Sequence, residues 1–197
     1  HWWLNVLPMN VDAFRLSGFW HKPRNEKIVL GPVWDFDRSI GSYDNRDDNP
    51  EAWSGSSGTD FFTYGWFNRL FQDPNWEQAI VDRWVELRQG VFTTNHINGV
   101  LDEFTAEIEE SALRNVAKWS AVPPNPNLDG EVDHMKDWLA RRIAFVDSEF
   151  PPVPQYNQPG GSATPGFQVT LSAPSGQIYY TTDGSDPRAP GGAPSAS

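Results

Sequence analysis

The sequence predicts an α+β fold, and three observations lead to this class. Two short β-type runs separated by "KPRNE" predict a hairpin. Apolar residues at spacings of three and four between residues 62 and 149 predict helices. At Pro151 the composition changes to a Pro/Gly-rich stretch, followed by alternating apolar residues. We therefore expect a mostly helical domain over residues 1–150, a linker over 151–166 and a β-domain over 167–197.

The first segments place a loop beside the end of a strand. Residues 1–7 read as the last turns of a helix that Pro8 ends, and "MNVDAFRLSG" follows as a loop. Strands are expected over residues 18–21 and 27–34. The second strand ends directly before Asp35, and catalytic groups are common where a strand enters a loop.

The remainder of the first domain is expected to be a polar loop and a helical bundle. Residues 43–60, rich in Gly, Ser and Asp, predict a long surface loop. Helices are expected over residues 62–71, from Asp73-Pro74 onward, over 95–119 and over 131–149. The apolar stripe of the third helix comprises Ile97, Leu101, Phe104, Ile108, Ala112, Val116 and Trp119. Exposed ion pairs are expected for Arg83, Arg88, Arg114, Arg141 and Arg142.

Composition and charge exclude several classes of protein. The 197 residues carry a net charge of −11, which argues against a nucleic-acid partner. No apolar run is long enough to span a membrane. Ten tryptophans indicate a buried core, and the lack of cysteine excludes disulfides and thiolate metal sites.

Three sets of acidic residues are candidates for chemistry. Asp35 and Asp37 in "GPVWDFDRSIG" either hold a divalent cation or cap a turn. Asp12 lies before the strand pair, so a hairpin would bring it close to Asp35, although it too could cap a turn. The loop acids Asp44, Asp47 and Asp48 lack an EF-hand spacing, and we expect a solvated loop there instead of a Ca²⁺ site.

The segments "NVD" and "GPVWDFDRSIG", together with "WFNRLFQDPNWEQAIVDRWVELRQGVF", "EESALRNVAKW" and "EVDHMKDWLARRIAFVDSEF", resemble the CotH family of spore-coat-type secreted protein kinases. The resemblance covers residues 1–150 and implies the helical C-lobe of an atypical kinase fold. It implies ATP with Mg²⁺ or Mn²⁺ as cofactors and Ser/Thr hydroxyls of proteins as acceptors. By this resemblance Asp12 matches the catalytic-loop acid, Asp35 the metal-binding acid, and Asp37 a helper ligand.

The sequence departs from the kinase pattern at two places. The catalytic loop of a kinase carries Asn five residues after its Asp, and Ser17 stands there instead. A ligand is then either lost or supplied by Asn10 or Asp37. The nucleotide-covering loop and phosphate-binding Lys belong upstream of these residues, so we expect the chain to be a piece that is inactive when isolated.

The tail "GQIYYTTDGSDPR" is similar to the chitobiase/β-hexosaminidase C-terminal-type domain, an immunoglobulin-like β-sandwich. We expect only its first hairpin, turning at "APSG". This resemblance implies an extracellular or cell-surface bacterial protein, for which a cell-wall or surface polysaccharide is an expected partner. The expected function is phosphorylation of extracytoplasmic proteins, and the alternative is an inactive surface or cell-wall scaffold. A D-x-D glycosyltransferase is disfavoured because the helix-rich sequence does not suit its α/β sheet.

Overall fold

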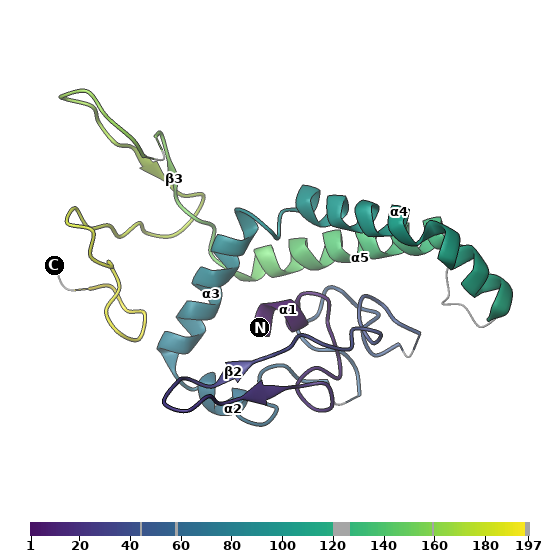
Figure 1. Ribbon diagram of the computed structural model, residues 1–197. Coiled ribbons are helices and arrows are strands. Elements are labelled where there is room, and N and C mark those ends of the chain that lie inside the picture. The colour runs from purple at the N-terminus through teal and green to yellow at the C-terminus, as the bar shows by residue number, and fades with distance from the viewer. Residues whose placement is uncertain (44, 58, 120–126, 159, 196–197) are drawn as a thin grey trace.

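The computed structural model describes residues 1–43, 45–57, 59–119, 127–158 and 160–195, and it confirms the α+β class (Figure 1). The described residues form helices and two small antiparallel strand pairs. In chain order the elements are α1 (Trp2–Val6), β1 (Trp20–His21), β2 (Val29–Leu30), α2 (Phe67–Leu70), α3 (Pro74–Arg88), α4 (Thr94–Lys118), α5 (Leu128–Glu149), β3 (Gln155–Tyr156) and β4 (Leu171–Ser172). Each helix in this part of the chain is too short or too polar for a bilayer-spanning segment.

The predicted first hairpin is confirmed, with shorter strands. β1 pairs with β2 in the register Trp20↔Leu30 and His21↔Val29. The Gly31 amide also donates to the Phe19 carbonyl at 2.9 Å, which continues the pairing toward the loops. The end of the hairpin therefore lies next to the segment that precedes β1.

Side-chain caps explain where the long helices begin. Asp73 accepts a hydrogen bond from the Asn75 amide at 3.0 Å, and Pro74 occupies the first helical position as predicted. Thr93 caps α4 through the His96 amide, and Asn127 caps α5 through the Gly130 amide. The prediction for residues 62–71 was too long, because only Phe67–Leu70 are helical.

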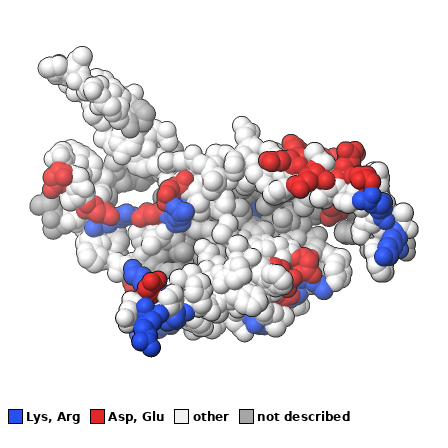
Figure 2. Space-filling view, viewed as in Figure 1, with Lys and Arg blue, Asp and Glu red and all other residues white. Residues whose placement is uncertain are grey.

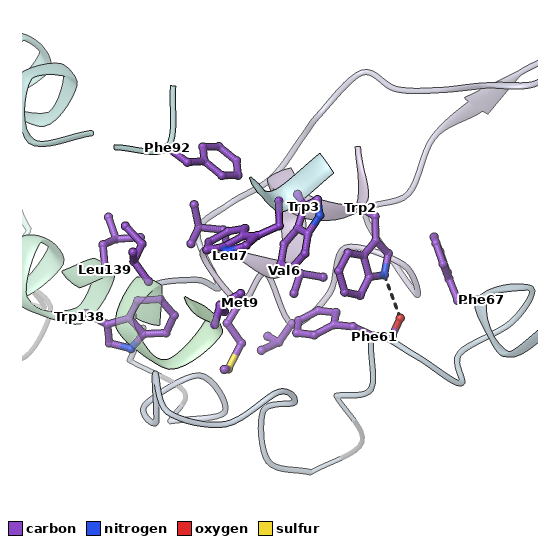
Figure 3. Packing of buried hydrophobic residues seen from close by; sticks show 14 residues of the cluster. Trp2, Trp3, Val6, Leu7, Met9, Phe61, Phe67, Phe92, Trp138 and Leu139 are labelled. Carbon is purple, nitrogen blue, oxygen red and sulfur yellow. Dashed lines mark hydrogen bonds between the residues drawn. The ribbon is translucent and has the colours of Figure 1, made fainter. Parts of the chain in front are cut away.

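The core is built around α1, which lies between α3, α5 and the loops (Figure 3). Trp2 donates from its indole to the Phe61 carbonyl at 3.2 Å, and Trp3 donates to the Ile80 carbonyl at 2.8 Å. The Trp3 and Trp84 rings lie 4.6 Å apart. These contacts satisfy the indole N–H groups while their rings are buried, so α1 is held in one position.

The outer half of α4 is not packed into a bundle as the sequence predicted. Ile97 and Leu101 pack against the core, but Phe104 is 58% exposed, Ile108 47% and Trp119 60%. A helix of 25 residues is about 37 Å long, and its C-terminal end extends beyond the body of the molecule (Figure 1). Helical periodicity therefore identified the helix but not the length of its buried stripe.

The C-terminal segment pairs its strands differently from the prediction. β4 pairs with β3, in the register Gln155↔Ser172 and Tyr156↔Leu171, and among the described residues no ladder crosses the "APSG" turn. The Asn157 side chain accounts for this pairing, because it donates to the Gln168 carbonyl at 3.0 Å and accepts from the Thr170 amide at 2.9 Å. Asn157, which lies in the predicted linker, thus holds the segment that contains Gln168 and Thr170.

Candidate functional site

The loop after α1 and the segment after β2 run side by side. The Val11 amide donates to the Arg38 carbonyl at 3.2 Å, and the Ile40 amide donates to the Pro8 carbonyl at 2.9 Å. The loop itself is tight, since the Leu16 amide donates to the Asp12 carbonyl at 2.9 Å. Backbone hydrogen bonds therefore fix where the side chains of both segments meet.

Asp35 is held at this junction by two side chains of the loop. The Ser17 hydroxyl donates to Asp35 Oδ2 at 3.0 Å, and the Asn10 amide group donates to the Asp35 carbonyl at 3.2 Å. Asp35 has a φ of 63°, in the left-handed region that Asp tolerates better than most residues. Its carboxylate is exposed, so it is fixed in place yet open to a ligand.

Asp12 lies in the same loop and pairs with arginine. Arg46 Nη1 and Nη2 contact Asp12 Oδ1 and Oδ2 at 2.9 and 3.2 Å, and Arg15 Nη2 contacts Oδ1 at 3.3 Å. The hydrogen bonds from Arg46 hold the pKa of the Asp12 carboxyl below its usual range. Asp12 is therefore ionised at neutral pH.

Asp37 follows Asp35 but points elsewhere. Its carboxylate forms an ion pair with Arg38 at 3.3 Å and is largely exposed. Within the described residues, no hydrogen bond joins Asp37 to the Asn10–Ser17 loop. The structure thus brings Asn10, Ser17 and Asp35 into contact and leaves Asp37 outside that group.

The oxygen atoms at this junction suit a hard cation that is shared with phosphates. Carboxylate, hydroxyl and amide oxygens are the donors that Mg²⁺ prefers, and it commonly uses only one or two carboxylates. Asn10 is fully buried, and its Oδ1 has no hydrogen-bond partner in the described part of the chain. No group of three or more His, Cys, Asp or Glu residues among the described ones could form an all-protein cage. The residues that could contribute oxygen ligands to a divalent cation here are thus Asp35, Ser17 and Asn10.

The described part of the loop over residues 43–60 differs from the solvated loop that the sequence predicted. Asp47 is fully buried, and it accepts from the Ser42 amide and hydroxyl, each at 2.8 Å. It is neither solvated nor available to Ca²⁺, while Asp44 lies outside the described residues. The same loop contributes Arg46 to the site, which the sequence analysis missed because nothing in a polar loop marks one arginine as a partner of Asp12.

The comparison with protein families gives a match over most of the chain. The model of the family described as CotH kinase protein matches residues 3–146. This range includes Asp12 and Asp35, all of α2, α3 and α4, and most of α1 and α5. The comparisons with curated proteins and with solved structures gave no match.

Proposed function

The chain belongs to the CotH kinase protein family, and from this premise we propose that it is part of a secreted bacterial kinase that transfers the γ-phosphoryl group of ATP to Ser or Thr hydroxyls of extracytoplasmic or surface proteins. The observation that supports the proposal is the junction in which Ser17 and Asn10 hold Asp35 beside the Asp12 loop. Phosphoryl transfer depends on positioning and charge neutralisation, and this junction provides fixed oxygen donors for both.

Each residue of the junction has a role in this proposal. Asp35 would bind the metal ion, Mg²⁺ or Mn²⁺, with Asn10 and Ser17 as neighbouring ligands or as groups that orient it. When bound, the ion neutralises charge on the phosphates of ATP. Asp12, ionised and fixed, would orient the acceptor hydroxyl and accept its proton. Asp37 would assist only if its contact with Arg38 were exchanged.

We further propose that residues 1–150 form the C-lobe of an atypical kinase. In the same proposal, residues 167–197 begin a chitobiase-type immunoglobulin-like domain that attaches the protein to cell-wall or surface polysaccharide. The support is the sequence similarity of the tail and its change of composition. Retention of the purified protein on insoluble cell-wall polysaccharide, lost on deletion of residues 167–197, is the expected result; equal retention without the tail would contradict it.

The alternative function is an inactive surface scaffold. Ser17 in place of the expected Asn, and the acidic face formed by α4, favour this second candidate (Figure 2). Partner binding that survives combined Asp12→Ala and Asp35→Ala substitution, without any phosphoryl transfer by the wild type, would support it.

The deciding experiment is Mg²⁺-dependent transfer of labelled γ-phosphate by the complete gene product. We expect Asp35→Ala to abolish transfer, because the metal site loses its carboxylate. Asp133→Ala, which removes an exposed carboxylate from α5, is the matched control and should leave transfer unchanged. Undiminished transfer by Asp35→Ala would reject the site, whereas no transfer by the wild type with any acceptor would favour the scaffold.

A further inference from the structure

We propose that Arg46, in the loop over residues 43–60, is the positioning residue of Asp12. Its guanidinium holds the Asp12 carboxylate in a single orientation relative to the acceptor hydroxyl. This inference rests on the proposed function. It assigns a role to a residue that belongs neither to the Asn10–Ser17 loop nor to the segment that contains Asp35.

The contact between Arg46 and Asp12 is bidentate. Nη1 reaches Oδ1 at 2.9 Å and Nη2 reaches Oδ2 at 3.2 Å, and the side chains are only 19% and 16% exposed. Two parallel hydrogen bonds from a planar guanidinium fix the plane of a carboxylate as well as its position. Arg15 reaches one oxygen at 3.3 Å from a side chain that is 44% exposed, so it cannot impose the same orientation.

The backbone of Arg46 is itself anchored. The Ser56 amide donates to the Arg46 carbonyl at 2.8 Å, and Gly55 packs so closely on that carbonyl that a Cβ would lie 2.3 Å from it. The next residue, the buried Asp47, accepts from the Trp138 indole through its carbonyl at 3.0 Å. Because α5 holds the loop at this point, the guanidinium approaches Asp12 from a fixed base.

The arrangement still leaves Asp12 able to act. A carboxylate has about four lone-pair positions, of which Arg46 occupies two and Arg15 a third. An acceptor hydroxyl can therefore donate to a remaining position while Arg46 stays bound. We infer that the pair works as a unit, with Arg46 acting through Asp12 and without contact to the phosphates.

The test measures the steady-state kinetics of phosphoryl transfer by the complete gene product. Arg46→Met should lower kcat on the order of 10- to 100-fold while the KM for ATP changes less than about twofold, because orientation and not nucleotide binding is lost. Arg46→Lys keeps the charge without the planar fork and should recover only part of the rate. The matched control is Arg141→Met, which removes an exposed ion pair with Glu51 of the same loop and should leave kcat unchanged.

A double-mutant cycle separates positioning from a general structural effect. If Arg46 acts only through Asp12, adding Arg46→Met to Asp12→Asn should lower the rate no further. Additive losses, an unchanged kcat in both Arg46 variants, or a kcat that rises on substitution would each overturn the inference. Full activity of Asp12→Asn would instead reject the proposed function, so the two failures are distinguishable. Arg46→Lys keeps the cycle usable if Arg46→Met does not fold.

Discussion

Ser17 is the residue at which the chain departs from the kinase pattern, and its side chain contacts Asp35 directly. Its hydroxyl lies 3.0 Å from Asp35 Oδ2 and its side chain is buried. A shorter side chain therefore reaches the metal-site acid that the family resemblance assigned. Serine at this position therefore keeps the two segments in contact.

We predict that Ser17→Ala raises the Mg²⁺ concentration required for half-maximal transfer by about threefold to tenfold, since Asp35 loses the hydrogen bond that orients it. A titration of transfer rate against Mg²⁺ measures this change. Ser111→Ala, which removes a hydroxyl from exposed α4, should leave the titration unchanged. An unaltered Mg²⁺ dependence in Ser17→Ala would mean that Ser17 has no part in holding Asp35.

The contact between Asp12 and Arg46 predicts that the free energy of unfolding depends on pH. Arg46 lowers the pKa of Asp12 in the folded state, so the pair stabilises the fold at any pH above the ordinary Asp pKa of about 3.9, and this stabilisation is lost as pH falls through the lowered value. We expect Asp12→Asn to reduce the free energy of unfolding by about 1–2 kcal/mol at pH 7. Urea unfolding at pH 7 and near pH 3 measures the difference, which should shrink at the lower pH. A pH-independent difference would show that packing, and not charge, accounts for it.

At the scale of elements, the sequence analysis succeeded where the signal is local. Asp73-Pro74 marks a helix start because the cap and the fixed φ of proline act within one turn. The exposure of Phe104 and Ile108 in α4 was not predictable, because an apolar stripe in the sequence does not show how far the element packed against it extends. Tertiary context decides that property.

The site was predictable to the same degree. The hairpin and the family resemblance made Asp12 and Asp35 candidates, and the structure confirms that their segments adjoin, while their roles stay predictions. The contact between Arg46 and Asp12 could not be predicted from the sequence, because it joins residues 34 positions apart and depends on how a long loop packs. Asp47 was misassigned for the same reason.

Arg142 is the clearest failure of a local prediction, and it links three elements. It was expected to form an exposed ion pair, but it is fully buried in α5 and donates to the carbonyls of Val6 at 2.9 Å, Pro50 at 3.1 Å and Ala52. Burial lowers the pKa of its guanidinium to about 10, so it stays charged at neutral pH. It ties α1 and the long loop to α5 through backbone acceptors.

We predict that Arg142→Lys lowers the free energy of unfolding by about 2–3 kcal/mol, because an ammonium group cannot reach all three carbonyls and leaves buried acceptors unpaired. Urea unfolding followed by tryptophan fluorescence measures this loss. The matched control is Arg141→Lys at the neighbouring exposed position, which should change stability by less than about 0.5 kcal/mol. Equal effects of the two substitutions would contradict the linking role of Arg142.

At the scale of the whole molecule, charge is unevenly placed. Acidic side chains gather along α4, where Asp102, Glu103, Glu107, Glu109 and Glu110 occur, and basic side chains gather near the tip of the β1–β2 hairpin (Figure 2). The tip carries Lys22, Arg24 and Lys27, all exposed. The net charge of −11 therefore describes the molecule but not each of its faces.

The distribution of buried residues predicts that residues 1–152 fold without the C-terminal segment. The described hydrophobic core and the residues packed against it lie between Trp2 and Phe150. The segment after it contacts α3 through the exposed pair Arg188–Asp82 and through the Gly191 amide, which donates to Asn75 Oδ1 at 2.8 Å. Exposed pairs of this kind contribute about 0–1 kcal/mol, so the free energy of unfolding of the truncated chain should lie within about 1 kcal/mol of that of the full chain. Urea unfolding measures it, with Arg188→Gln in the full chain as the control for loss of the ion pair alone. A truncated chain that no longer unfolds in one cooperative transition would show that the C-terminal segment is part of the domain and not an attachment to it.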